Sequence, residues 1–304
     1  MAPRSLGRSR PRYGERVIAI LLFLAALVSV LTTVGILLAL AEPTIEFLGA
    51  VGVVDFLTGT EWTPLFSEPR FGVLPLVGGT LVVTVIALAV AMPLGLGSAV
   101  YLSEYAKPRS RRLLKPTLEV LAGIPTVVYG FFALAAVTPA LRAIWPGGDG
   151  PAVFNALAAG LVMGIMIIPT IASLSEDAMS AVPSGLRDGG YALGSSRMQV
   201  AQRIVVPAAL SGIVAAFVLG ISRAIGETMI VAIAAGGQPN LSLNPLEGMQ
   251  TMTAFIAAAG IGDQPTGSIG YKTIFAVGSL LFLLTFVMNL VSIRLVDRFR
   301  EVYE

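Results

Sequence analysis

The stretch VLGISRAIGETMIVAI, residues 218–233, is apolar almost throughout, yet it carries an arginine and a glutamate four residues apart. Arg223 and Glu227 are the only charged residues between Pro207 and Glu247. A guanidinium offers a planar fork of donors that fits the oxygens of an oxyanion, and a carboxylate accepts a proton-bearing oxygen. The pair therefore indicates either part of an anion path or a structural ion pair that satisfies itself.

The composition defines the class of protein around this pair. Hydrophobic residues make up 55% of the chain and charged residues 12%, and the mean hydropathy is +0.84. Soluble domains contain about 25% charged residues, so we expect an all-α integral membrane protein. The absence of cysteine and histidine excludes thiol nucleophiles, disulfides, Cys or His metal sites and Ser-His triads. We predict no catalytic residue, no metal site and no nucleic-acid partner.

Uncharged runs predict the membrane spans. Each is long enough to cross about 30 Å of hydrocarbon as a helix, and the five runs without any charge are 17–41, 71–103, 120–141, 150–175 and 273–293. A sixth run, from Ile204 to about Ala235, is equally apolar apart from Arg223 and Glu227. The expected fold therefore has six transmembrane helices.

The charges of the connecting segments predict the orientation, because basic residues favour the cytoplasmic side. The N-terminal segment 1–16 is basic, whereas segment 42–70 is acidic apart from Arg70, and the alternation continues to the C-terminus. The basic residues of alternate segments are Arg4, Arg8, Arg10, Arg12, Arg16; Lys107, Arg109, Arg111, Arg112, Lys115; Arg187, Arg197, Arg203; and Arg294, Arg298, Arg300. Both termini are expected in the cytoplasm, with 42–70 and 236–271 outside.

Arg223 is expected near the middle of the membrane. A helix rises about 1.5 Å per residue, which puts Arg223 about 24 Å beyond Pro207, and the spacing of four places Glu227 on the same helix face. A charge at that depth costs at least about 2.5–3.5 kcal/mol and normally faces a cavity or a partner. We predict that Arg223 and Glu227 line a substrate path, in which Glu227 sets the position of the arginine.

The cytoplasmic segment 176–203 carries a second pattern. Pro183 and Ser184 form a helix start, and apolar residues alternate with polar ones beyond them. This pattern predicts a short amphipathic helix, a turn and a second helix that enters the membrane. The alternative is an interfacial helix that lies on lipid.

The same segment resembles the EAA loop of ABC importer permeases. The family pattern is Glu-Ala-Ala-x-x-x-Gly, nine residues, then Ile-x-Leu-Pro, and this chain has Asp-Gly-Gly-x-x-x-Gly, nine residues, then Ile-x-Val-Pro. The resemblance implies a coupling helix that docks in a groove of an ATP-binding subunit. Gly194, Ile204 and Pro207 match the pattern, whereas Asp188, Gly189 and Gly190 replace its Glu-Ala-Ala. The expected coupling residues are Asp188, Gly189, Gly190, Tyr191, Gly194, Ile204 and Pro207. Each glycine in place of an alanine lowers helix propensity by about 1 kcal/mol.

Further stretches narrow this resemblance to the C-type permease of phosphate-specific ABC importers. They include EVLAGIPTVVYGFFAL, MGIMIIPTIASLSEDAM and GISRAIGETMIVAIAAGG, and the similarity runs from about residue 70 to the C-terminus. It implies a type I permease fold with a first helix at 17–41, a core at 71–298, a coupling loop at 176–203 and an outer loop at 236–271.

The same resemblance implies a multi-pass protein of the prokaryotic inner or plasma membrane that carries inorganic phosphate and contacts lipid. It implies three protein partners: a second permease in a heterodimer, a dimer of ATP-binding subunits and an extracytoplasmic phosphate-binding protein. ATP and Mg would be bound by the partner ATPase, so no cofactor is expected in this chain, which is a transport subunit and not an enzyme.

Other interpretations of the sequence remain open. The substrate of an ABC permease of this type could instead be another oxyanion, sulfate or molybdate, and the sister phosphate permease, of the A type, shares a related Arg…Gly-Glu-Thr segment. A stand-alone secondary carrier also has many spans and charges within the membrane, but its halves should show matching broken helices. A membrane scaffold without transport activity does not explain the charges within the sixth run.

Overall fold

The computed structural model describes residues 13–64, 66–145, 150–262 and 264–298. Within these ranges the regular secondary structure is helical, apart from an isolated antiparallel bridge between Trp62 and Phe71, so the predicted all-α class is confirmed. Arg4, Arg8, Arg10, Arg12 and Arg300, on which part of the predicted orientation rests, lie outside the described residues.

Five helical segments in the described part of the chain are long and apolar enough to cross a membrane. They are α1 (Tyr13–Val51), α3 (Leu74–Val100) with the π-helical turn η1 (Tyr101–Tyr105), α5 (Thr126–Phe132) with η2 (Ala133–Val137) and α6 (Thr138–Ile144), α7 (Ala156–Ser180), and α14 (Ile269–Arg298). A sixth span is present if the bent pair 197–208 and 210–226 counts as one. The prediction of six spans is confirmed in that sense.

The third predicted span, 120–141, begins later than expected. Residues 120–122 end a separate helix, α4 (Pro108–Ala122), and α5 starts only at Thr126. Gly123 caps α4 and Pro125 precedes α5 with an extended backbone; a proline also disfavours helical geometry in the residue before it. The chain therefore breaks at Gly-Ile-Pro, and charge-free composition alone did not reveal that break.

The core of the bundle is the pairing of α3 with α7, which make more residue contacts with each other than any other two elements. Small residues allow this close approach. A Cβ on Gly160 would lie 2.7 Å from the side chain of Ile86, and one on Gly164 would lie 2.8 Å from the carbonyl oxygen of Ala87. Since real Cβ atoms essentially never approach so closely, larger residues at 160 and 164 would separate the two helices.

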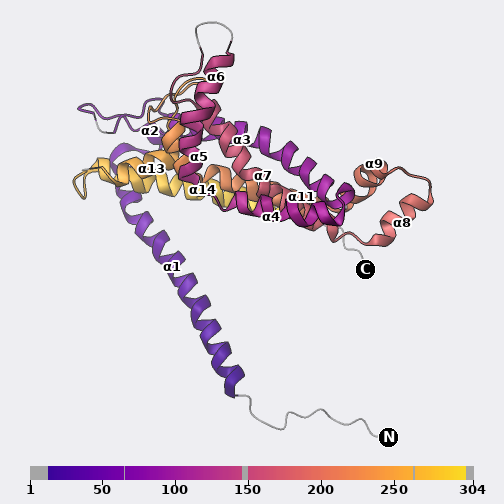
Figure 1. The fold of residues 1–304 in the computed structure, drawn as a ribbon. Coiled ribbons are helices and arrows are strands. Elements are labelled where there is room, and N and C mark those ends of the chain that lie inside the picture. The colour runs from indigo at the N-terminus through magenta and orange to yellow at the C-terminus, as the bar shows by residue number, and fades with distance from the viewer. Residues whose placement is uncertain (1–12, 65, 146–149, 263, 299–304) are drawn as a thin grey trace.

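The first helix, α1, extends away from the rest of the bundle over most of its length (Figure 1). Its C-terminal part is attached to α14 by an ion pair between Lys272 and Glu46 (2.5 Å) and a hydrogen bond between Thr44 and Ser279 (2.8 Å). Phe47 then packs into an aromatic cluster with Phe56, which lies on the short helix α2 (Val53–Thr58). The helix is thus anchored at one end only.

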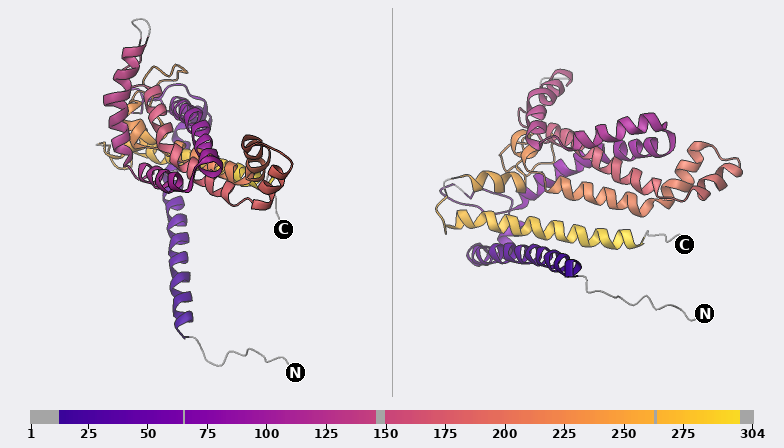
Figure 2. Two further views of the ribbon diagram at one scale, coloured as in Figure 1. Left: turned by 45° about the vertical axis from the view of Figure 1, so that its right-hand side comes forward. Right: turned by 60° about the horizontal axis from the view of Figure 1, so that its bottom comes forward.

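Different helices lie at the two ends of the bundle. The segment predicted to be cytoplasmic folds into α8 (Ser184–Ala192), α9 (Arg197–Val200), the π-helical turn η3 (Ala201–Val205) and α10 (Val206–Ala208), which is the expected helix, turn and second helix. Helices α8 and α9 lie at one end of the molecule, while α2 and α13 (Met252–Gly260) lie at the opposite end (Figure 1). The end of α14 lies on the side of α8 and α9 (Figure 2).

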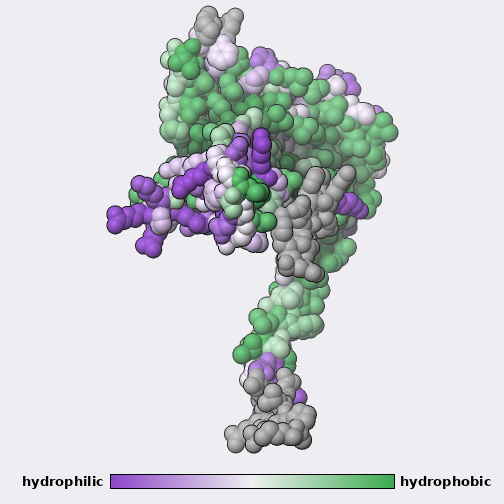
Figure 3. Space-filling model, turned by 90° about the vertical axis from the view of Figure 1, so that its right-hand side faces the viewer, coloured by the Kyte–Doolittle hydropathy of each residue, from purple (hydrophilic) through white to green (hydrophobic). Residues whose placement is uncertain are grey.

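The polarity of the surface follows the same division. Viewed from the end that carries α8 and α9, hydrophilic side chains gather over that end while apolar side chains cover the flanks (Figure 3). Such a distribution suits a bundle whose flanks face hydrocarbon or partner helices.

Candidate translocation site and coupling segment

Arg223 and Glu227 do not share a helix face, so that prediction is wrong. Helix α11 (Leu210–Ile225) ends before Glu227, with Gly226 as its C-cap, and α12 (Met229–Ala234) begins two residues beyond it. Glycine is a poor helix former, and its N–H bonds back to the carbonyls of Ala224 and Ser222. The spacing of four therefore spans a break between two helices and not one helical turn.

A second break also contradicts the predicted continuous helix 204–235. The segments 197–208 and 210–226 meet at an angle of 73°, beside Pro207, whose ring removes a backbone donor. The straight distance of about 24 Å from Pro207 to Arg223 therefore does not apply. Arg223 instead lies 13 residues into α11 from Leu210, which corresponds to about 20 Å along that helix.

The Arg223 guanidinium reaches across to α7. It donates to the hydroxyl of Thr170 (3.3 Å) and lies 3.8 Å from the sulfur of Met166. In the part of the chain that the structure describes, no carboxylate forms an ion pair with it. The self-satisfied ion pair with Glu227 is therefore not formed, and the cation has only neutral partners among the described residues.

Glu227 is held by backbone groups. The residue is 8% exposed, and its Oε1 accepts hydrogen bonds from the N–H groups of Met229 (3.1 Å) and Ile230 (3.2 Å). These donors belong to the start of α12, where N–H groups lack partners within the helix. The hydroxyl of Thr253 on α13 donates to the carbonyl oxygen of Glu227 (2.6 Å), so the predicted outer loop also fixes this break.

In the EAA-like segment, some motif residues are packed against the returning helix and others are exposed. Gly190 is buried, and a Cβ there would lie 2.6 Å from the Ile204 side chain and 3.1 Å from that of Val200, so Gly190 and Ile204 are in contact. Asp188, Gly189 and Tyr191 are exposed on α8. The motif therefore joins α8 to the returning helix on one side and leaves the other side open.

Gly194 ends α8 for a conformational reason. Its φ is +79°, a left-handed conformation that glycine adopts without a steric penalty. The N–H of Gly194 donates to the carbonyl of Tyr191 (2.9 Å), and the N–H of Ser195 donates to that of Gly190 (3.1 Å). This hydrogen-bond pair is the Schellman arrangement that closes helices, and it reverses the chain toward α9.

A buried ion network that the sequence did not predict joins α4 to α7. Glu176 is fully buried and pairs with Arg111 and with Lys115 (2.7 Å), while Asp177 also binds Lys115 (2.5 Å). The hydrogen bonds that Lys115 donates to Asp177 and Glu176 raise the pKa of Lys115 above its ordinary value. The signal was present in the sequence, since Glu176 and Asp177 directly follow a charge-free run, but their partners are about 60 residues away in sequence.

A second missed contact joins α8 to the bundle. Arg187 pairs with Glu104 in η1 (3.0 Å) and donates to the carbonyl oxygens of Met179 and Val182 (both 2.7 Å). Glu104 and Arg187 are 83 residues apart in sequence, and no local pattern connects them.

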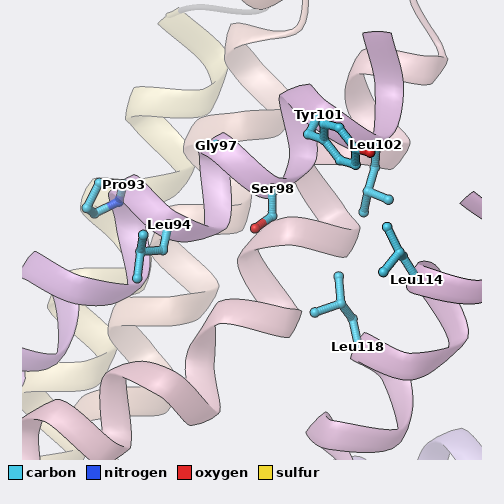
Figure 4. Close-up of a pocket in the computed structure, with 8 residues that line it drawn as sticks. All are labelled: Pro93, Leu94, Gly97, Ser98, Tyr101, Leu102, Leu114 and Leu118. Atoms are coloured by element: carbon cyan, nitrogen blue, oxygen red, sulfur yellow. The ribbon is translucent and has the colours of Figure 1, made fainter. Parts of the chain in front are cut away.

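Several grooves lie in the described surface. One, of about 420 Å³, lies between α3 with η1 and α4 and is lined by Pro93, Leu94, Gly97, Ser98, Tyr101, Leu102, Leu114 and Leu118 (Figure 4). None of these lining residues is charged, so the groove does not suit an anion.

Comparison with known proteins gives the family. Residues 91–301 match the model of the binding-protein-dependent transport system inner membrane component, and the chain belongs to this family. It is a multi-pass protein of the bacterial inner membrane.

Relatives cover most of the chain. It is 35% identical over 267 residues to the probable ABC transporter permease protein YqgH of Bacillus subtilis, covering 87% of this chain and 85% of that protein. It is 31% identical over 283 residues to the phosphate transport system permease protein PstC of Mesorhizobium japonicum, covering 87% and 84%. It is 33% identical over 290 residues to PstC 1 of Mycobacterium tuberculosis, covering 84% and 85%.

Solved structures support the fold. A bacterial ABC transporter that imports alginate aligns with a TM-score of 0.61 at 15% identity, covering 96% of this chain and all of that one. The MetNI methionine ABC transporter aligns with a TM-score of 0.54 at 20% identity, covering 76% and 95%. At these identities the likeness concerns the arrangement of helices alone.

Proposed function

We propose that this chain is a C-type permease subunit of an ATP-driven importer of inorganic phosphate. The observation that carries the proposal is the Arg223 guanidinium, which lies at the end of a membrane helix without a carboxylate partner among the described residues. A cation in that position is costly unless it meets an anion or water. The similarity to phosphate permeases over most of the chain supports phosphate as that anion.

Two features of the site suit phosphate. The guanidinium fork of Arg223 and the hydroxyl of Thr170 offer donors to anion oxygens. Glu227 supplies a carboxylate whose orientation is fixed by the N–H groups of Met229 and Ile230. Phosphate retains a proton at neutral pH and can donate it to this carboxylate, whereas sulfate has no proton and meets only repulsion.

The remaining subunits follow from the same proposal. The exposed side of α8, with Asp188, Gly189 and Tyr191, contacts one member of an ATP-binding subunit dimer, which binds ATP and Mg. A second permease completes the path as a heterodimer. A phosphate-binding protein docks on the outer segments 42–70 and 236–271. A stand-alone carrier is disfavoured, because the family is defined by dependence on a binding protein.

Substitutions that change the charge of Arg223 test this proposal. Arg223→Gln keeps a polar side chain but removes the cation, and we expect phosphate uptake to fall about 100-fold or more, as when a key electrostatic donor is lost. Arg223→Lys should restore uptake only in part, because a point charge lacks the bidentate fork. Uptake is measured with radiolabelled phosphate in vesicles that contain the whole complex, and assembly is checked by pull-down.

A matched control is available. Arg142, like Arg223, is a basic residue in the last turn of a helix, but it is exposed at the outer end of α6. Arg142→Gln should leave uptake unchanged. Near-normal uptake by Arg223→Gln would contradict the proposed path.

Glu227 tests the choice between phosphate and the alternative oxyanions. Glu227→Gln keeps an oxygen that can accept from Met229 and Ile230, but it removes the carboxylate that accepts the phosphate proton. We expect weaker phosphate uptake and relaxed discrimination against sulfate. If the unchanged complex instead takes up sulfate or molybdate in preference to phosphate, the alternative substrate is correct.

A further inference from the structure

Helix α8 packs against η3 through Gly190, and its side-chain contacts with α7 and η1 come from one arginine, Arg187. The Arg187 side chain is 18% exposed and that of Glu104 is 4% exposed, so this ion pair is largely removed from water. Nε and Nη2 of Arg187 donate to Glu104 Oε1 at 3.2 and 3.0 Å. The remaining members of α8, except Gly190, are exposed.

The same guanidinium also binds the end of α7. Nη1 donates to the carbonyl oxygen of Val182 and Nη2 to that of Met179, both at 2.7 Å. Carbonyl groups at a helix C-terminus lack partners within the helix and favour a nearby cation. A planar fork reaches the carboxylate and both carbonyls at once, which a lysine ammonium cannot do in the same geometry.

These contacts connect α8 to the two helices of the core. Glu104 lies in η1, which continues α3, and Met179 lies in the last turn of α7. Helix α7 also carries Thr170, the partner of Arg223; Thr170 precedes Met179 by nine residues, or about 14 Å along the helix. Close packing at Gly160 and Gly164 keeps α3 and α7 together.

We propose that Arg187 is a positioning residue that makes α3 and α7 follow the movement of α8. Together with Glu104 and the carbonyls of Met179 and Val182, it forms what we call the Arg187 clamp. When the ATP-binding subunit displaces α8, the clamp passes that displacement to α7 and so to the Thr170–Arg223 contact. This inference rests on the proposed docking of α8 to the ATP-binding subunit.

The experiment measures how much substrate is moved per ATP. In vesicles with the whole complex, Arg187→Met should assemble and hydrolyse ATP in response to loaded binding protein, but phosphate moved per ATP should fall about tenfold, a common size for coupling between sites. Arg187→Lys should fall less, because it keeps the charge but not the fork. Glu104→Gln should also lower the ratio.

A double variant at Arg187 and Glu104 tests whether the two residues act as one unit or make independent contributions to coupling. If Arg187 and Glu104 act together, Arg187→Met with Glu104→Gln should be no worse than Arg187→Met alone, since changes in one network are not additive. Arg203, an exposed arginine of η3, provides the control, and Arg203→Met should keep the ratio.

Three results would overturn the inference. The first is an unchanged ratio in Arg187→Met and Glu104→Gln. The second is a proportionate loss of uptake, ATPase activity and assembly in Arg187→Lys, which would make the clamp a structural support only. The third is a double variant whose losses multiply. If wild-type vesicles carry another oxyanion, the proposed substrate fails, but the ratio measured with that anion still tests the clamp.

Discussion

The junction of α4 with α7 and the break between α11 and α12 each bury a carboxylate, but they compensate it differently. Glu176, fully buried at the junction, is paired with two cations, Arg111 and Lys115. Glu227, at the break, accepts from backbone N–H groups, and Arg223 nearby has a hydroxyl and a thioether as partners. At the first site, which we call the closed site, the charge of Glu176 is neutralised by cations of the same chain. At the second, which we call the open site, Arg223 has no carboxylate partner among the described residues.

The contrast distinguishes a structural use of charge from a functional one. Burying a charge costs several kcal/mol, which partners repay only when they are placed well. Glu176 has such partners, so its network ties α4 to α7. Arg223 lacks a counterion among the described residues, and a charge kept in a membrane span without one is best explained by a passing ligand. The first site should therefore control stability and the second transport.

The largest effect on stability is expected from opening the closed network. Arg111→Met combined with Lys115→Met leaves Glu176 buried without a cation, and breaking a buried pair in this way costs about 3–5 kcal/mol. Lys115→Met alone should cost less, since Arg111 remains bound to Glu176. Thermal unfolding in detergent, followed by the fluorescence of Trp62 and Trp145, measures the difference. A double variant as stable as the single one would show that the network contributes little.

In the coupling segment, the stability of α8 should depend on the left-handed backbone conformation at Gly194. Gly194→Ala forces a residue with a Cβ into a left-handed conformation, which costs about 1–2 kcal/mol. Gly194→Trp should in addition obstruct docking, so that the ATP-binding subunit no longer co-purifies while the spans still insert. Gly189→Ala is the matched control: a Cβ there meets nothing within 4 Å and φ is not positive. It should stabilise α8 by up to about 1 kcal/mol.

If both glycine variants behave alike, the end of α8 does not depend on the left-handed residue. If the Gly194→Trp chain keeps full association with the ATP-binding subunit and full transport, the docking assignment is wrong. Co-purification from membranes and thermal unfolding together separate these outcomes.

A substitution at the open site, Arg223, should impair transport strongly but change the thermal stability less than the Arg111 and Lys115 variants do. Arg223→Gln removes a hydrogen bond worth about 0.5–1.5 kcal/mol and also removes a charge from an apolar surrounding, so the two changes oppose each other. We expect a net change within about 1 kcal/mol, measured by the same thermal unfolding. Destabilisation as large as that of the Arg111 and Lys115 double variant would mean that Arg223 is a structural residue.

Much of the fold was predictable because a bilayer imposes a strict length and composition on each span. The spans were found from charge-free runs, and α8 from Pro183 and Ser184. The breaks beside Pro207 and at Gly226 were not predicted, because the apolar stretches on either side of each residue fit one continuous span. Pro207 and Gly226 are poor helix formers and signal both breaks, but the spacing of four between Arg223 and Glu227 also fits a single helix.

The site was predictable in its residues but not in its geometry. Arg223 and Glu227 stood out as lone charges, whereas Thr170 lies 53 residues from its partner and Glu104 lies 83 from Arg187. Contacts between distant segments depend on packing and leave no periodic signal in one sequence. The cytoplasmic placement of both termini stays a prediction, which labelling of single cysteines at Glu61 or Glu247 from one side of the membrane tests.

The smallest effect is expected in the outer loop, where the half-buried carboxylate of Glu247 has neutral hydrogen-bond partners. Glu247 accepts from the side-chain amides of Asn240 (2.7 Å) and Asn244 (2.9 Å). Hydrogen bonds from Asn244, Ser242 and Asn240 lower the pKa of Glu247 below its ordinary value of 4.5. A lowered folded pKa means that the charged form favours the folded loop. The contribution is complete above pH 4.5 and is lost as the pH falls through the lowered folded value.

Hydrogen exchange of residues 240–247 should therefore be unchanged between about pH 7 and pH 5, after correction for the intrinsic rate. It should increase below the ordinary pKa of 4.5. Glu247→Gln cannot titrate, so its exchange should be slightly faster at neutral pH and show no such increase. Loop carbonyls at Pro245, Leu246 and Glu247 accept from backbone N–H groups near the start of α7, so loosening should extend there and no further. An increase of equal size in the Gln variant would assign the effect to another group.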